Sequence, residues 1–283
     1  MSLVKEILAK AEKLPAVPAV VQQVLALVQN PEFSFSKLID TVRLDPGITA
    51  HVLRMANSPF YGLRQKISSL EQALALLGTR NLVEIVLSTQ VVKYFQVDQG
   101  GYRLERGELW RHCMATALLA HRMGDMLKYQ DTATLFTAAL LHDVGKLILS
   151  QYVGERYHKI ERMVGEDGKS FVEAEREVLG VDHALLGGLV ARHWNFPESI
   201  VTAIAFHHAP ERAAKYGQLT ALVALANVLT LSMGFSGGAA GLAVPMPEGL
   251  AAMAGFGPRE MDKIALEVKD INDKATELLN LAG

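Results

Sequence analysis

Apolar residues recur along this chain at helical spacing, in segments separated by proline, glycine and polar turns. One segment carries Val20, Val21, Val24, Leu25 and Val28 on a single face, which is the i, i+3, i+4 pattern of an amphipathic helix. No segment keeps the strict alternation of a β-strand for long enough to indicate one. The pattern therefore predicts an all-α protein.

The predicted helices form one all-α unit over residues 1–283, with an internal boundary. Residues 96–107 are polar and glycine-rich, which is typical of a connection between two packed parts. A later stretch is rich in glycine and alanine and contains prolines, so we expect a flexible excursion there. The predicted parts are an N-terminal helical part at 14–97, a second part at 98–231, the excursion at 232–257 and a final helix at 258–282.

The most informative segment is the apolar helix predicted over residues 133–149, because it contains His142 and Asp143 where core residues are expected. An ionised aspartate buried without a partner is costly, so such a group is normally paired or bound to a metal. An imidazole nitrogen beside a carboxylate oxygen suits Mn, Fe or Zn. Lys146, one turn further on, can steady a carboxylate or a phosphate. A purely structural hydrogen bond between the two residues is the alternative.

Polar side chains also interrupt other apolar helices, at their starts, centres or ends. Glu108 and His112 lie one helical turn apart, so both project from the same face. Each such residue alone has a simple packing explanation, but an unmatched polar group in a core costs about 1–3 kcal/mol. We therefore expect convergence on a shared metal site, with these candidate ligands: Glu108, His112, His142, Asp143, His183, His207, His208 and Asn227.

The remaining histidines are weaker candidates for the site. His51, His121 and His158 lie beside arginine or lysine, which is typical of surface positions. His193 precedes Trp194 at the end of a predicted helix, where a packing or capping role is expected.

Composition limits the partners and the compartment. The net charge is −2 with no long basic run, so there is no electrostatic case for nucleic acid or an anionic membrane. The single Cys113 excludes an internal disulfide and fits a reducing compartment. The N-terminus lacks a signal-peptide pattern, and no apolar run reaches the roughly 20 residues that span a bilayer. We therefore expect a cytoplasmic protein.

The polar motifs, taken in order, resemble the HD superfamily of metal-dependent phosphohydrolases. They are Glu108-x3-His112, His142-Asp143-x2-Lys146, His183 and His207-His208. They look particularly like the HD-GYP phosphodiesterase pattern, in which these positions supply ligands to two or three metal ions and the HD aspartate bridges metals. The resemblance implies one or two divalent transition metal ions here, with Fe or Mn favoured over Ni or Zn.

The match to the HD-GYP phosphodiesterases within that superfamily is incomplete. There an aspartate in an Ala-Asp-Val setting completes the site, whereas this chain reads Ala226-Asn227-Val228. The segment after His208 also lacks the Gly-Tyr-Pro signature of the cyclic-di-GMP enzymes. We therefore do not expect cyclic-di-GMP hydrolysis.

Further motifs resemble the HDOD family, the HD-related output domain of bacterial signalling proteins. The similarity covers residues 14–230 and implies a multi-helix HD-domain-like bundle with an N-terminal helical subdomain. The motifs are Leu14-Pro-x-x-Pro18, Ile39-x5-Asp45-Pro46-x6-Leu53-x-x-Ala56-Asn57-Ser58, Leu74-x2-Leu77-Gly78, His193-Trp194-x-Phe196-Pro197 and Phe206-His207-His208-x-Pro210.

Two functions and one simpler interpretation follow. The first function is a regulatory output module that contacts other signalling proteins, with any metal structural. The second is a metal-dependent phosphohydrolase acting on a phosphoester small molecule, with Asp143 holding the ions and Lys146 neutralising charge on the transferred group. The simpler interpretation is a packed polar cluster without metal.

Overall fold

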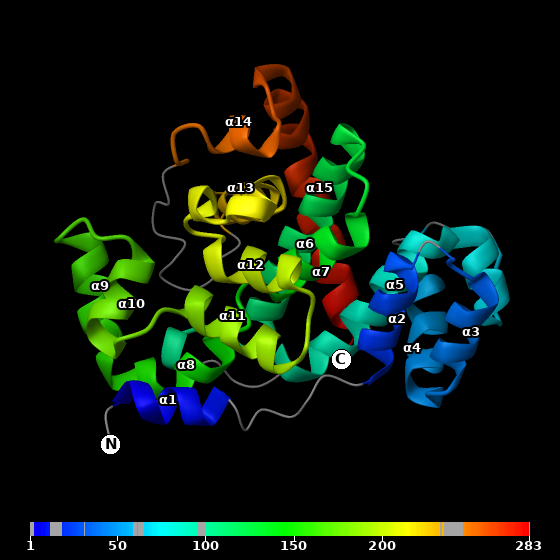
Figure 1. The fold of residues 1–283 in the computed structure, drawn as a ribbon, viewed down its shortest axis with the longest axis horizontal. Coiled ribbons are helices and arrows are strands. Elements are labelled where there is room, and N and C mark those ends of the chain that lie inside the picture. Colours follow the sequence, from blue (N-terminus) through cyan, green and yellow to red (C-terminus); the bar gives the residue numbers. More distant parts are fainter. Residues whose placement is uncertain are drawn as a thin grey trace.

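The computed structural model describes residues 3–11, 19–30, 32–58, 61, 65–95, 100–232, 234 and 246–282. Within these ranges the regular structure is helical and contains no β-strand, which confirms the all-α prediction (Figure 1). The first helices are α1 (Leu3–Ala11), α2 (Ala19–Gln29), α3 (Phe35–Arg43), α4 (Pro46–Ala56) and α5 (Leu70–Phe95). The later helices are α6 (Glu108–Leu127), α7 (Thr132–Leu141), α8 (Lys146–Val153), α9 (Tyr157–Gly165), α10 (Phe171–Leu179), α11 (His183–His193), α12 (Glu198–Phe206), α13 (Gly217–Ser232), α14 (Leu250–Ala254) and α15 (Pro258–Ala282).

Local sequence signals begin the N-terminal helices. The side chain of Ser34 accepts the backbone N–H of Lys37 at the start of α3, and Asp45 caps α4 ahead of Pro46. Figure 1 shows α2 to α5 gathered at one side of the molecule, whereas α1 lies against α8 and α11. The N-terminal part is therefore a helical group beside the larger second part. Its motif at residues 14–18 lies outside the described residues.

Helix α5 combines two helical runs that meet at Gly78. This glycine has φ of +79° and ψ of 169°, so the helical backbone is interrupted there. Positive φ carries little steric cost for glycine because it lacks a Cβ. Gly78 is therefore the site of a kink between two helical runs.

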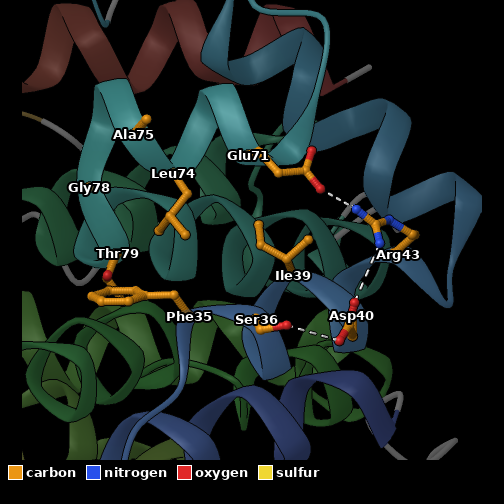
Figure 2. Close-up of a pocket in the computed structure, with 10 residues that line it drawn as sticks. All are labelled: Phe35, Ser36, Ile39, Asp40, Arg43, Glu71, Leu74, Ala75, Gly78 and Thr79. Atoms are coloured by element: carbon orange, nitrogen blue, oxygen red, sulfur yellow. Dashed lines mark hydrogen bonds and ion pairs between the residues drawn. The ribbon is translucent and has the colours of Figure 1, made fainter.

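A cavity of about 670 Å³ lies between α3 and α5 in the N-terminal part. Arg43 reaches Asp40 on its own helix and Glu71 on α5, so an ion-pair network borders the cavity (Figure 2). The ring of Phe35 lies at the opposite end, and the side chain of this residue is exposed. Each residue that lines this cavity belongs to α3 or α5, so it lies outside the second part of the molecule.

The second part is organised around α6, α7 and α13. The residues of helix α13 from Leu219 to Val228 are buried, so this helix lies in the core. It packs against α6, α7, α12 and α14, while α11 pairs with α12. The ends of α7 and α12 and the start of α11 consequently meet near the centre of this part.

The prediction of one continuous helix over residues 133–149 is wrong. Helix α7 ends at Leu141, residues 142–145 form a turn, and α8 begins at Lys146. Gly145 permits this turn to approach α11 closely, because a Cβ there would lie 2.0 Å from the main-chain oxygen of His183. The close approach places the His-Asp doublet in a helix break that faces α11, rather than within a helix.

Two segments that the sequence assigns to connections contain packed residues. Residues 96–99 lie outside the described residues, but η2 (Gly100–Tyr102) packs on α8, and the side chain of Tyr102 is completely buried. In the glycine- and alanine-rich segment, residues 235–245 also lie outside the described residues. Helix α14 lies in that segment, with Leu250 and Ala254 buried.

One run, Thr132–Gly165, has the length and composition of a membrane-crossing helix, with a mean hydropathy of 1.3 in its most apolar window. However, 94% of that window is buried inside the fold, and core helices of soluble proteins pass the same test. The run is also interrupted by the turn at residues 142–145. It is therefore weak evidence for a membrane span.

Candidate metal centre

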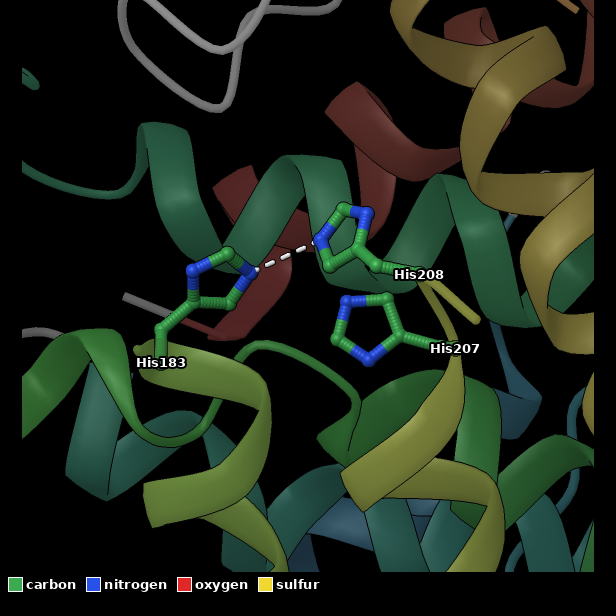
Figure 3. A group of neighbouring side chains, drawn as sticks. All are labelled: His183, His207 and His208. Atoms are coloured by element: carbon green, nitrogen blue, oxygen red, sulfur yellow. Dashed lines mark hydrogen bonds between the residues drawn. The ribbon is translucent and has the colours of Figure 1, made fainter. Parts of the chain in front are cut away.

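Six of the predicted ligands form two neighbouring groups of side chains. We call His112, His142 and Asp143 the first group, and His183, His207 and His208 the second group. Within each group the potential ligand atoms lie within 4.8 Å of one another. Figure 3 shows the second group, in which His183 comes from the start of α11 and the other two from the turn after α12. The Nε2 atoms of His183 and His208 are 2.9 Å apart.

Asp143 lies between the two groups. Its Oδ2 atom is 3.6 Å from Nε2 of His112 and 3.5 Å from Nε2 of His142. Its Oδ1 atom is 3.2 Å from Nε2 of His183 and 3.9 Å from Nε2 of His207. Each carboxylate oxygen therefore faces a different group. This is the arrangement required of a carboxylate that bridges two ions.

His142 and His207 are oriented by the same kind of hydrogen bond. In both, Nδ1 donates a hydrogen bond of 2.7 Å to a carbonyl three residues back, that of Ala139 or Ile204. Helix ends leave such carbonyls without helical partners. Because the proton lies on Nδ1, Nε2 presents a lone pair. Burial lowers the pKa of His142 to about 4 and lowers that of His207 well below its usual range, so both imidazoles are neutral.

His183 is oriented by a carboxylate instead. Its Nδ1 lies 2.5 Å from Oε2 of Glu175, and its main-chain N–H donates to the same oxygen at 2.9 Å. The hydroxyl of Tyr102 donates to Oε1 of Glu175 at 2.5 Å. Burial alone would lower the pKa of His183, but the charge of Glu175 and the hydrogen bonds to Asp143 and Glu175 together outweigh it and raise this pKa to about 9. The second group is thus supported by a buried anion.

The sequence interpretation missed Glu175, although a signal was present. Phe171, Glu175 and Leu179 are spaced four residues apart, so the acid lies on the apolar stripe of α10. All three side chains are buried in the structure. A single acid in an apolar stripe indicates a buried partner, and here that partner is His183.

Lys146 supports the other side of Asp143. Its Nζ lies 2.6 Å from Oδ2 of the carboxylate, and both residues are almost completely buried. Burial alone would raise the pKa of Asp143, but the charge of Lys146 and the neighbouring imidazoles hold it well below its usual range. Asp143 is therefore ionised, and the two residues form a buried ion pair.

The site passes a chemical test for a bound cation. Nε2 of His207 and Oδ1 of Asn227 are buried and make no hydrogen bond, and the buried Oδ1 of Asp143 faces Nε2 of His183 at 3.2 Å. All three atoms carry lone pairs, and a buried acceptor left unsatisfied costs about 1–3 kcal/mol. A cation satisfies such atoms, whereas an anion does not. The mixed imidazole and carboxylate set suits Fe, Mn, Ni or Zn.

Glu108 and Asn227 lie outside the two groups as defined. The carboxylate of Glu108 has local partners: its Oε2 accepts the backbone N–H of Glu105 at 2.8 Å, and its Oε1 lies 3.7 Å from the guanidinium of Arg111. The first turn of α6 satisfies this carboxylate locally. Asn227 is buried on α13, which packs against α6, α7 and α12.

His121 is not the surface residue that its neighbours in the sequence suggested. Its Nδ1 contacts Glu84 of α5, and its Nε2 lies 3.2 Å from Oδ2 of Asp125. The imidazole is only 16% exposed. The neighbouring Arg122 suggested that this turn of α6 is exposed. However, α5 covers the preceding position, which is His121.

The fold and these two groups define an all-helical protein with an HD-type histidine and aspartate centre. A family model, the HDOD domain, matches residues 14–210, so this chain belongs to the HDOD family. This confirms the family resemblance inferred from the motifs.

Solved structures share the fold. An HDOD domain protein of unknown function from Geobacter sulfurreducens has a TM-score of 0.82 at 24% identity, covering 98% of this chain and 97% of its own. A Shewanella amazonensis protein, named provisionally as a phosphohydrolase, has a TM-score of 0.75 at 22% identity, with 98% of each chain covered. At these identities the likeness establishes the fold.

For one relative, the match spans less than half of the relative's own length. An uncharacterised protein from Treponema pallidum is 24% identical over 224 residues, which is 77% of this chain. The match spans 42% of that relative.

Proposed function

We propose that this protein is a cytoplasmic regulatory module that binds divalent metal ions at the two groups and acts by contacts with other signalling proteins. The observation that supports it best is Asp143, whose two oxygens face different histidine groups. The ions would be held by His112, His142, Asp143, His183, His207 and His208. Bound metal would stabilise the folded state by mass action, as structural ions generally do.

Burial of the centre favours a structural role for the metal over catalysis. Every member of the two groups is nearly inaccessible except His208, which is exposed. A substrate phosphate would have to approach both ions, yet only one ligand borders solvent. The cavity of about 670 Å³ lies instead between α3 and α5. A metal-stabilised core beneath a separate contact surface is the arrangement expected of an output module.

A metal-dependent phosphohydrolase is the second candidate. The exposure of His208 and the cation of Lys146 beside Asp143 favour it, as does the name given to the Shewanella amazonensis protein. When bound, divalent ions supply Lewis-acid activation of water and neutralise phosphate charge. Lys146 would add a positive charge beside the transferred group.

One set of measurements separates these functions. The protein is purified without chelator, its metal content is determined, and turnover of a generic phosphomonoester and of cyclic-di-GMP is assayed with added Mn²⁺. We expect bound metal, a melting temperature that falls on chelation and negligible turnover of both substrates. Robust turnover that is lost in His142→Ala would favour the enzyme. Metal-free protein with an unchanged melting temperature would contradict metal binding in either role.

A further inference from the structure

We infer that Glu175 and Tyr102 are positioning residues that fix His183 for metal binding, so that occupancy of the second group depends on both. The inference rests on the proposed metal binding and adds two residues that do not themselves contact the ion.

Glu175 holds His183 at two points. One carboxylate oxygen accepts both the main-chain N–H and the Nδ1–H of His183, at 2.9 and 2.5 Å. This double contact restricts the rotation of the side chain about its first bonds. Nε2 is thereby directed to a point 3.2 Å from Oδ1 of Asp143 and 2.9 Å from Nε2 of His208. The ring is placed for coordination before any ion binds.

The carboxylate distinguishes His183 from the other oriented imidazoles. His142 and His207 donate Nδ1–H to neutral carbonyls, whereas His183 donates to an ionisable oxygen. A carboxylate behind a ligating imidazole raises the electron density at its other nitrogen and so strengthens the metal bond. The second group should therefore lose more affinity than the first when this support is removed.

Tyr102 fixes Glu175 in turn. Its hydroxyl donates a hydrogen bond of 2.5 Å to the second carboxylate oxygen, and its ring contacts those of Tyr157 and Phe171, at centroid distances of 6.4 and 6.1 Å. Glu175 is completely buried, and its two oxygens are satisfied by His183 and Tyr102. Tyr102 belongs to η2, in the connection between the two parts of the chain, so metal binding and the packing of this connection are coupled.

The coupling is tested by titrating the chelated full-length protein with Co²⁺. The variants are Glu175→Gln, Tyr102→Phe and, as a control, Glu177→Gln, which removes an exposed acid of the same helix. We expect Glu175→Gln to weaken one of two binding events by about 10–100-fold. Tyr102→Phe should weaken the same event by up to about 10-fold. Glu177→Gln should leave both events unchanged.

The outcomes are distinguishable. If the unmodified protein binds no Co²⁺, the proposed metal binding and this inference both fail. If it binds Co²⁺ and Glu175→Gln gives the same affinities and the same Co²⁺ absorption spectrum, only the inference fails, even if the variant melts at a lower temperature. If Glu175→Gln does not fold, Tyr102→Phe decides, and unchanged affinity in that variant overturns the inference.

Discussion

The two histidine groups share one carboxylate but are supported by opposite charges. In the first group, Lys146 places an ammonium 2.6 Å from the Asp143 oxygen that faces His112 and His142. In the second group, Glu175 places a carboxylate behind His183. A cation beside a ligand atom opposes the binding of a metal ion, whereas an anion behind an imidazole favours it. The second group should therefore bind metal more tightly.

The difference shows how such a centre can remain folded at partial occupancy. Lys146 neutralises Asp143 without any ion, so the first group carries its own counter-charge. The second group has no comparable cation contact in the described residues, and Nε2 of His207 makes no hydrogen bond. An ion in the second group therefore satisfies an atom that the protein leaves unsatisfied. We expect the second group to fill first.

The largest expected effect comes from Asp143→Ala, which removes the residue common to both groups. Metal binding should be lost at both, and Lys146 would remain buried without this carboxylate. Removing one partner of a buried ion pair costs about 3–5 kcal/mol of unfolding free energy. Metal analysis and urea unfolding of the chelated variant measure the two effects. Retention of one tightly bound ion would mean that the three histidines suffice alone.

A matched pair of variants, His142→Ala and His207→Ala, separates the groups. Each variant should retain one ion. The ion left in His142→Ala lies in the second group, and the ion left in His207→Ala lies in the first. Because the groups are supported by opposite charges, the ion in His142→Ala should bind at least about 10-fold more tightly. Titration with Mn²⁺ compares the two dissociation constants. Equal constants, or the reverse order, would refute the proposed ranking.

Lys146→Met tests the opposing charge directly. The chelated protein should be less stable by about 3–5 kcal/mol, because Asp143 loses its buried counter-ion. Affinity of the first group should rise by about 10-fold or more, since the competing cation is gone. His142→Ala in the same background should abolish that gain. If affinity falls in Lys146→Met, the lysine supports the bound state rather than opposing it.

Asn227→Asp adds a charge where a buried amide oxygen makes no hydrogen bond. If this oxygen faces a metal ion, affinity should rise by about an order of magnitude. Combining the substitution with His142→Ala or His207→Ala identifies the group that it serves. A variant that is destabilised with or without metal, and that binds metal no better, would place Asn227 outside the site.

The smallest effect concerns His121, which contrasts with the neutral imidazoles of His142 and His207. Burial alone would lower its pKa, but Glu84 and Asp125 outweigh burial and raise it. The resulting stabilisation is complete below the unfolded pKa of about 6.5 and is lost as the pH rises through the folded value. Unfolding free energy measured against pH should therefore decline over that range, and His121→Gln should flatten the curve. An unchanged slope in the variant would contradict the ion pair.

Local patterns predicted most helices, because periodicity and capping act within one or two turns. The segment with Val20, Val24 and Val28 on one face lies within α2, and the final helix predicted at residues 258–282 is α15. The error at residues 133–149 has a distant cause, namely the close approach of Gly145 to His183 on α11. A helix break imposed by a neighbouring helix leaves little trace in local apolar spacing.

The sequence by itself determined that the chain is all-helical, that it belongs among HD-related proteins and that polar side chains interrupt its apolar helices. Only the tertiary structure decided which oxygen of Asp143 faces which histidines, and that Glu108 is satisfied within its own turn. It also decided that Tyr102 and Glu175, 73 residues apart, share a hydrogen bond. Periodicity specifies the buried face of a helix, whereas the partners on that face depend on how distant helices pack.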